Sequence, residues 1–197
     1  VCVRNSIFLE TGEETVVRER KVVMGQRGMI HVYCGDGKGK TSAALGLMIR
    51  AAGRGKKILF VRFLKNDDSG EIAVLEQISS ICQLRMPKVP GFYWTMTKDQ
   101  KEELKRAYTR VWESIEEQAG EFDVLVMDEF TSTFRYGLIP NERVLSFLGK
   151  EGERPEIILT GRDPDGRVLE MADYISEIKA VRHPFEQGIP AREGIEY

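Results

Sequence analysis

The residues whose types and spacing are best suited to chemistry lie at positions 35–42, in the order Gly-Asp-Gly-Lys-Gly-Lys-Thr-Ser. This stretch follows the apolar run 29–33 and precedes 43–52, a run of good helix formers, so the chain is predicted to pass from a strand through a turn into a helix. Backbone N–H groups face into such a turn and the helix dipole adds positive potential, which favours bound phosphate. Lys40 would pair with phosphate oxygens, and the Thr41 hydroxyl would reach a Mg²⁺ ion.

The spacing of these glycines is shorter than usual. The common phosphate-loop pattern, G-x-x-x-x-G-K-[ST], would place its first glycine at Cys34, whereas this chain has it at Gly35. We expect the shortened loop to hold a triphosphate, but not necessarily in the orientation found in an ordinary ATPase. The alternative is a glycine-rich turn that carries surface lysines, which is entropically costly unless its backbone must approach another group closely.

Two carboxylates follow a second apolar run. Asp128 and Glu129 come directly after 124–127, Val-Leu-Val-Met. Because ligands of open α/β sheets bind beyond the carboxyl ends of the strands, we expect this pair to lie beside the phosphate loop and to hold Mg²⁺ together with Thr41. The alternative is a pair of surface carboxylates at a strand end. These motifs alone also allow an ATPase in which Glu129 activates water.

Three cations end other predicted strands. Arg162 either reaches the polyphosphate as a bidentate cation or lies in a surface turn. Arg62 and Lys65 either face the same cleft or lie in solvent.

An aromatic loop is the third unusual feature. Phe92, Tyr93 and Trp94 follow Pro90-Gly91, a sequence that fits a loop better than a strand or a helix. Aromatic rings exposed in a loop need a reason, and both core packing and a large apolar ligand remain open.

Alternating strand-like and helix-like segments from residue 29 onward predict an α/β protein with a mostly parallel sheet and helices on both faces. Thr97 and Gln100 have capping-box spacing and open a long amphipathic helix, and Asp163-Pro164 predicts a short helix over 164–172. Near-continuous apolar runs predict strands covered on both faces, at 29–33, 58–63, 123–127, 156–160 and 174–179. Residues 1–27 do not fit this pattern, and we expect an N-terminal arm of unassigned role ahead of one domain over 28–197.

Composition narrows the class of partner. The 197 residues carry a formal net charge of -2 with charges of both signs interspersed, which predicts neither nucleic-acid nor membrane binding. No apolar run has the length of a membrane-spanning helix. Three cysteines form no CxxC pair, and two histidines are too few for a zinc cluster, so a cytoplasmic protein with a small-molecule substrate is expected.

Taken together, these motifs make the sequence resemble the P-loop type of ATP:corrinoid adenosyltransferases, the cob(I)yrinic acid a,c-diamide adenosyltransferase family. The resemblance spans 27–197 and departs from the family's pattern at Cys34, Ser42, Arg62 and Asn66, where threonine, threonine, glutamine and glycine are usual. The matching stretches are 28–41, 62–65, 91–94, 128–129, 135–138, 159–162, 172–173, 183–185 and 194–197.

This resemblance implies a RecA-like P-loop fold and a transfer of the 5′-deoxyadenosyl group of ATP to Co(I) of a corrinoid, with release of triphosphate. The nucleotide would lie reversed, so that its ribose C5′ faces the corrinoid. Lys40, Thr41 and Glu129 would be catalytic; Thr41, Asp128 and Glu129 would hold Mg²⁺, or Mn²⁺ in its place. ATP would contact Gly35, Asp36, Gly37, Lys38, Gly39, Lys40, Thr41, Ser42, Arg62 and Arg162.

The resemblance also gives the aromatic loop a role. Phe92 and Trp94 would contact the corrinoid and exclude its lower axial ligand, which makes Co(II) easier to reduce. A reduced flavoprotein would donate the electron, the protein would be a homodimer, and the pathway would be adenosylcobalamin synthesis or salvage. The alternatives are an ATPase or kinase that cleaves the terminal phosphate, and a nucleotide-dependent switch without chemistry.

Overall fold

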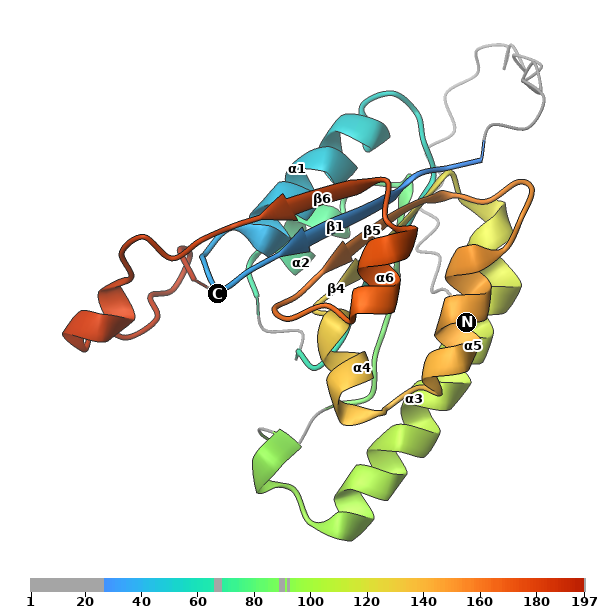
Figure 1. Cartoon of the computed structure of the whole chain (residues 1–197). Coiled ribbons are helices and arrows are strands. Elements are labelled where there is room, and N and C mark those ends of the chain that lie inside the picture. The colour runs from blue at the N-terminus through green and yellow to red at the C-terminus, as the bar shows by residue number, and fades with distance from the viewer. Residues whose placement is uncertain (1–26, 66–68, 89–90, 92, 197) are drawn as a thin grey trace.

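A six-stranded, wholly parallel sheet is the centre of the computed structural model, which describes residues 27–65, 69–88, 91 and 93–196 (Figure 1). The order along the sheet is β3-β2-β4-β5-β1-β6, so β5 separates the strand before the phosphate loop from the strand that ends in Asp128. This is the arrangement of a RecA-like P-loop fold, and the predicted fold class is confirmed. The strands are β1 (Ile30–Cys34), β2 (Ile58–Arg62), β3 (Ile81–Leu84), β4 (Val124–Asp128), β5 (Glu156–Thr160) and β6 (Tyr174–Glu177).

Helices cover both faces of the sheet, as predicted. Side chains of α1 and α2 pack on one face, and those of α3, α4, α5 and α6 pack on the other. The α-helices are α1 (Lys40–Ala52), α2 (Glu71–Leu75), α3 (Lys98–Gln118), α4 (Thr131–Tyr136), α5 (Asn141–Gly149) and α6 (Gly166–Met171). Short 3₁₀ turns are η1 (Tyr93–Thr95), η2 (Ala119–Glu121) and η3 (Pro184–Gln187). Among the described helices, none has the length and apolar character needed to cross a membrane.

The two strands that lead to the site are the most deeply covered. Every residue of β2 and β4 is buried, which confirms the expectation from their continuous apolar runs. Trp112 and Tyr108 of α3 are fully buried against the same sheet. The ends of β2 and β4 are therefore held firmly, and the polar groups that follow them are fixed in place.

Helix α3 begins as predicted. The Thr97 hydroxyl accepts a hydrogen bond from the Gln100 amide at 3.3 Å, and the Gln100 side chain accepts one from the Thr97 amide at 2.8 Å. The start of α6 was predicted wrongly. Its cap is Asp165, which accepts from the Arg167 amide at 3.0 Å, because the backbone of Asp165 is still extended and the helix begins only at Gly166.

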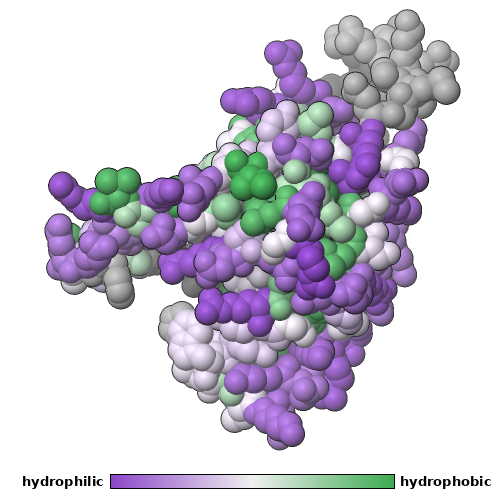
Figure 2. Space-filling model, in the orientation of Figure 1, coloured by the Kyte–Doolittle hydropathy of each residue, from purple (hydrophilic) through white to green (hydrophobic). Residues whose placement is uncertain are grey.

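Strand β6 contradicts the prediction of burial. All four of its residues are exposed, because β6 is the edge strand of the described sheet and, within that sheet, pairs with β1 alone (Figure 1). In Figure 2 the mostly hydrophilic surface is interrupted by hydrophobic side chains over this edge, where Ile175 is exposed. The short strand β3 and the helices α2, α4 and α5 were not predicted.

Candidate functional site

The glycines of the phosphate loop are required by a contact within the chain. Gly35 and Gly39 have φ of 99° and 122°, in the left-handed region that favours glycine. A Cβ at Gly35 would lie 2.4 Å from the Ile178 carbonyl oxygen, and one at Gly37 would lie 2.7 Å from the Lys179 carbonyl carbon. The Gly37 amide donates to the same Ile178 oxygen at 2.8 Å. The close approach predicted from the glycines is therefore made by the segment that follows β6.

Lys40, at the start of α1, folds back over the loop. Its ammonium group donates to the Gly37 carbonyl oxygen at 2.7 Å. Burial lowers the pKa of Lys40; Glu129 opposes this shift, whereas nearby Arg162 adds to it. A partly desolvated ammonium group with one neutral oxygen partner is well suited to pair with an incoming phosphate.

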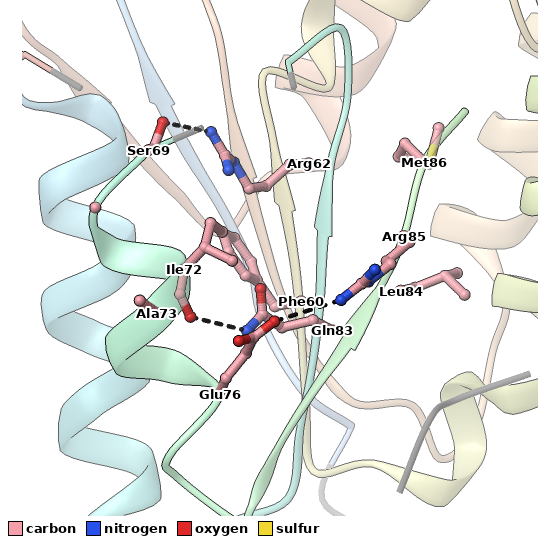
Figure 3. A pocket seen from close by; sticks show the side chains of 11 residues that line it. Phe60, Arg62, Ser69, Ile72, Ala73, Glu76, Gln83, Leu84, Arg85 and Met86 are labelled. Carbon is pink, nitrogen blue, oxygen red and sulfur yellow. Dashed lines mark hydrogen bonds and ion pairs between the residues drawn. The ribbon is translucent and has the colours of Figure 1, made fainter. Parts of the chain in front are cut away.

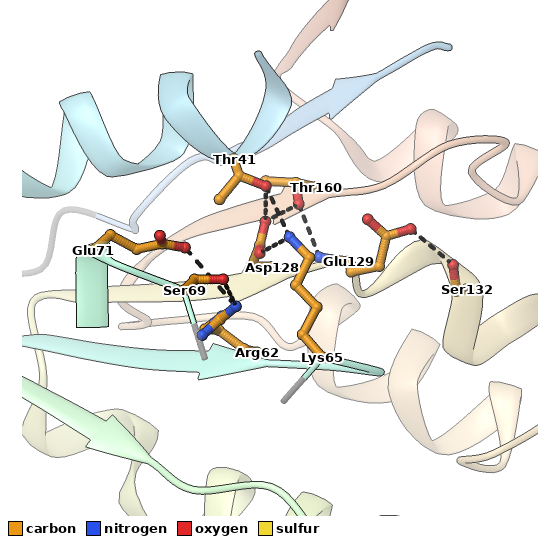
Figure 4. A network of polar contacts seen from close by, with 9 residues as sticks. All are labelled: Thr41, Arg62, Lys65, Ser69, Glu71, Asp128, Glu129, Ser132 and Thr160. Atoms are coloured by element: carbon orange, nitrogen blue, oxygen red, sulfur yellow. Dashed lines mark hydrogen bonds and ion pairs between the residues drawn. The ribbon is translucent and has the colours of Figure 1, made fainter. Parts of the chain in front are cut away.

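The carboxylate of Asp128 is fully buried and lies at the centre of a polar network (Figure 4). Its Oδ1 accepts from the hydroxyls of Thr41 at 2.9 Å and Thr160 at 2.6 Å. Its Oδ2 accepts from the ammonium group of Lys65 at 2.7 Å, and Lys65 also donates to the Thr41 hydroxyl at 3.1 Å. The ends of β4, β5 and β2 thus meet the first residues of α1 around one buried charge.

Glu129 turns away from this network. Its φ is 57°, and its amide donates to the Thr160 hydroxyl at 2.9 Å. Its carboxylate instead accepts from the Ser132 hydroxyl at 3.1 Å (Figure 4). The left-handed backbone therefore sends two consecutive carboxylates in different directions, Asp128 to Thr41 and Glu129 to the open cleft.

The end of β2 makes a similar turn. Leu64 has φ of 53°, and its amide donates to the buried Tyr108 hydroxyl at 2.8 Å. Burial raises the pKa of Tyr108 to about 12, so this hydroxyl stays protonated at neutral pH. The turn brings Lys65, the next residue, to Asp128.

A cleft of about 730 Å³ opens above the loop, a volume within the usual range for ligand sites. Of the predicted site residues, those that line it are Asp36, Gly37, Lys38, Gly39, Lys40, Thr41, Ser42, Glu129 and Arg162. Gly35 and the fully buried Asp128 are not among the lining residues. Sequence reasoning did not assign Ser69, Glu71, His183, Ile195 and Glu196, which also line it.

The C-terminal segment reaches the loop from the other side. Lys38 donates to the Ile195 carbonyl oxygen at 3.1 Å and to Glu196 Oε1 at 2.7 Å. Hydrogen bonds from Arg192, and then from Lys38, lower the pKa of Glu196 to about 2. Similarly, the Ala180 amide donates to Asp36, and this bond lowers the pKa of that carboxyl. The only sign of these contacts in the sequence was that residues 194–197 matched the resembled family.

Two predicted site residues lie elsewhere. Arg62 lines a neighbouring pocket instead of the nucleotide cleft. Trp94 is in η1 with 68% of its surface exposed, and it does not line the cleft; Phe92 lies outside the described residues.

The donor set fits a hard divalent cation. Thr41 and Asp128 present oxygen atoms to one point, and the Lys65 ammonium group stands there as the positive charge. Among the described residues no group of three or more His, Cys, Asp or Glu side chains is arranged so that it could hold a metal ion. Such a cluster is not needed, because Mg²⁺ in phosphate-loop sites takes most of its other ligands from phosphate and water.

Comparison of the sequence with known proteins finds several relatives. The chain is 35% identical to the corrinoid adenosyltransferase of Escherichia coli K12, over 87% of each chain, and to the corrinoid adenosyltransferase CobA of Salmonella typhimurium with the same identity and coverage. It is 31% identical to the corrinoid adenosyltransferase of Pseudomonas aeruginosa, over 87% of this chain and 85% of that protein. The crystal structure of a KaiC-like protein from Pyrococcus horikoshii superposes on 78% of this chain and on 73% of its own chain, with a TM-score of 0.45 and 17% sequence identity. The sequence profile of ATP:corrinoid adenosyltransferase BtuR/CobO/CobP matches residues 26–197, and the chain belongs to that family.

Proposed function

We propose that this protein transfers the 5′-deoxyadenosyl group of ATP to the Co(I) centre of a corrinoid, in adenosylcobalamin synthesis or salvage. The cobalt–C5′ bond forms with the electron pair of Co(I), and the bond from C5′ to the triphosphate oxygen breaks. Cobalt is oxidised to Co(III), and triphosphate leaves with the bonding pair. No side chain has to act as the nucleophile.

One observation carries this proposal beyond family membership: the cleft gathers cations where the leaving group must be bound. Lys38, Lys40, Lys65 and Arg162 all line it beside the loop amides, and Lys65 also donates to the Thr41 hydroxyl. Cations placed where negative charge develops lower the barrier to departure of triphosphate. Glu129 faces the same space and limits the net positive charge.

Thr41 and Asp128 would hold Mg²⁺, or Mn²⁺ in its place, with Glu129 acting through water. The ion supplies further positive charge to the triphosphate. The Lys65 ammonium group already pairs with the Asp128 carboxylate, so it and the ion would compete for the same negative charge.

Co(I) has to be generated in place, so we propose a reduced flavoprotein as the electron donor. We also propose that the protein acts in the cytoplasm as a homodimer.

Identification of the products tests the reaction. With ATP, Mg²⁺ and a corrinoid reduced to Co(I), we expect adenosylated corrinoid and inorganic triphosphate in equal amounts. ADP as the product would instead indicate an ATPase or a kinase. Unchanged ATP beside reduced corrinoid would indicate a switch without chemistry.

The exposed ring of Trp94 fits corrinoid contact better than core packing. We propose that Trp94, with Phe92, displaces the lower axial ligand and so makes Co(II) reducible. The Trp94→Ala variant is then expected to lose about tenfold in rate when the assay starts from Co(II), because an aromatic contact is worth about 0.5–1.5 kcal/mol beyond the apolar area that it buries. With chemically generated Co(I), its rate should fall less than twofold.

A thermal melt separates this role from packing. Trp94→Ala should keep its Tm, whereas the same change at Trp112, which is fully buried, should cost about 3–5 kcal/mol. Equal losses from Co(II) and Co(I), together with a large fall in Tm, would assign Trp94 to the core.

A further inference from the structure

Three buried polar side chains form a row across the carboxyl ends of neighbouring strands. Arg62 of β2 is the register partner of Asp128 of β4, and Thr160 ends β5, the strand on the other side of β4. Arg62 is 6% exposed, and Asp128 and Thr160 are both 0% exposed. Because buried polar groups need hydrogen-bond partners, the contacts of each member indicate what it does.

The two neighbours of Asp128 in this row point to different places. Arg62 points into a pocket of about 310 Å³ beside α2, where its guanidinium donates to the Ser69 hydroxyl at 2.8 Å (Figure 3). The same guanidinium forms an ion pair with Glu71 at 3.8 Å. Thr160 instead donates to Asp128 Oδ1 at 2.6 Å (Figure 4). Of these two neighbours, Thr160 is therefore the one that holds the carboxylate.

The Thr160 hydroxyl contacts both residues of the carboxylate pair. It accepts a hydrogen bond from the Glu129 amide at 2.9 Å while it donates to Asp128. A backbone amide can only donate and an ionised carboxylate can only accept, so the single hydroxyl proton has to point to Asp128. Valine, which has nearly the same shape as threonine, could make neither bond.

The bond to Glu129 holds an unusual backbone. Glu129 has φ of 57°, in a region that residues other than glycine rarely adopt. Such a conformation persists only where the surrounding contacts hold it. The bond from the Glu129 amide to Thr160 is one of these contacts, and the bond from the Ser132 hydroxyl to the Glu129 carboxylate is another. Thr160 thus helps to keep Glu129 turned to the cleft while Asp128 faces Thr41.

We infer that Thr160 is a positioning residue for the site that binds the metal ion and the triphosphate. Thr160 is fully buried and is not among the residues that line the cleft, so its hydroxyl acts through the two carboxylates. Hydrogen bonds that orient metal-binding carboxylates raise the affinity for the metal. This inference rests on the proposed function, because it concerns the metal site of the same reaction.

The test measures metal binding in the absence of a corrinoid. Mn²⁺ is titrated into the complex of the protein with ATP, and its binding is followed by electron paramagnetic resonance. The Thr160→Val variant is expected to need about tenfold more Mn²⁺ for half-saturation, because both carboxylates lose the group that orients them. Its affinity for ATP measured in EDTA should change by less than about twofold, since the loop amides and lysines that bind phosphate remain.

Two further variants separate positioning from packing. Thr160→Ser keeps the hydroxyl and should bind Mn²⁺ like the wild-type protein. Thr133→Val is the matched control, because Thr133 is 1% exposed and its hydroxyl donates to the Phe130 carbonyl oxygen at 2.7 Å, within α4. It removes a buried hydrogen bond that involves neither carboxylate, so it should lower the Tm and leave the Mn²⁺ requirement unchanged.

The inference is wrong if Thr160→Val binds Mn²⁺ as tightly as the wild-type protein does. It is also wrong if Thr160→Ser or Thr133→Val loses as much Mn²⁺ affinity as Thr160→Val. Should Thr160→Val not fold, Thr160→Ala decides in its place, with the same expected direction. If the wild-type protein made no triphosphate in the product assay, the proposed function would fail, whereas these binding measurements would not change.

Discussion

Replacing Lys40 with alanine is expected to weaken ATP binding about 10- to 100-fold and to slow transfer by at least a similar factor. Lys40 folds back over the phosphate loop, and among the described residues its ammonium group donates to the Gly37 carbonyl oxygen. A charge-assisted bond to phosphate is worth about 1.5–3 kcal/mol, and a donor aimed at a leaving oxyanion adds to kcat as well. Titration calorimetry with ATP and single-turnover transfer measure the two effects separately.

Lys56→Ala serves as the control, because Lys56 is exposed and pairs with Asp123 away from the cleft. It should change neither quantity. If Lys40→Ala kept both its ATP affinity and its rate, the phosphate loop would not be the triphosphate site.

Asp128→Asn is expected to lower the free energy of unfolding by about 3 kcal/mol and to raise the Mg²⁺ concentration needed for half-maximal transfer. Breaking a buried ion pair by removing one partner is costly because the other charge is left without compensation. The Lys65 ammonium group now lies 2.7 Å from Asp128 Oδ2. In Asp128→Asn it would face a neutral amide, whose NH₂ group is itself a donor. For a chain of this length the expected fall in Tm is about 6–12 °C.

Glu129→Gln is the matched variant. Its carboxylate bonds to Ser132 and lies outside the Asp128 network, so we expect a raised Mg²⁺ requirement with little change in Tm. The double variant Asp128→Asn/Lys65→Met should recover most of the lost stability but not the Mg²⁺ response, because neither charge of the pair is then left without its partner. If both Asp128→Asn and Glu129→Gln needed the same Mg²⁺ concentration as the wild-type protein, the two carboxylates would have a structural role and would not bind the metal.

The sequence predicted the parts of this site whose cause is local. The phosphate loop, the Asp128–Glu129 pair and the capping box at Thr97 follow from short patterns, and each was found where expected. The glycines of the phosphate loop predicted that its backbone lies very close to another group. The identity of the approaching segment, Ile178–Lys179, depends on how β6 pairs with β1 and could not be read from the loop.

The rest depends on tertiary structure. Lys65 and Asp128 meet only because β2 and β4 are neighbours, and because Leu64 and Glu129 adopt a left-handed backbone that neither residue type predicts. The edge position of β6 was missed although two of its four residues, Ser176 and Glu177, are polar, because the order of strands in the sheet decides which strand lies at the edge. The position of Arg62 at the end of β2 could be predicted from the sequence, but that it lines the neighbouring pocket and not the nucleotide cleft depends on the fold.

The pairing of β1 has a consequence for how the chain folds. This strand, which carries the phosphate loop, pairs only with β5 and β6, both of which come late in the chain. A growing chain on the ribosome therefore contains the complete loop sequence long before it has the strands that give the loop its shape. Pairing β1 with β5 closes the long chain segment between them, and this closure costs conformational entropy. We therefore expect β1 to join the sheet among the last steps of folding. ATP then stabilises the finished protein and cannot act as a template for its early folding.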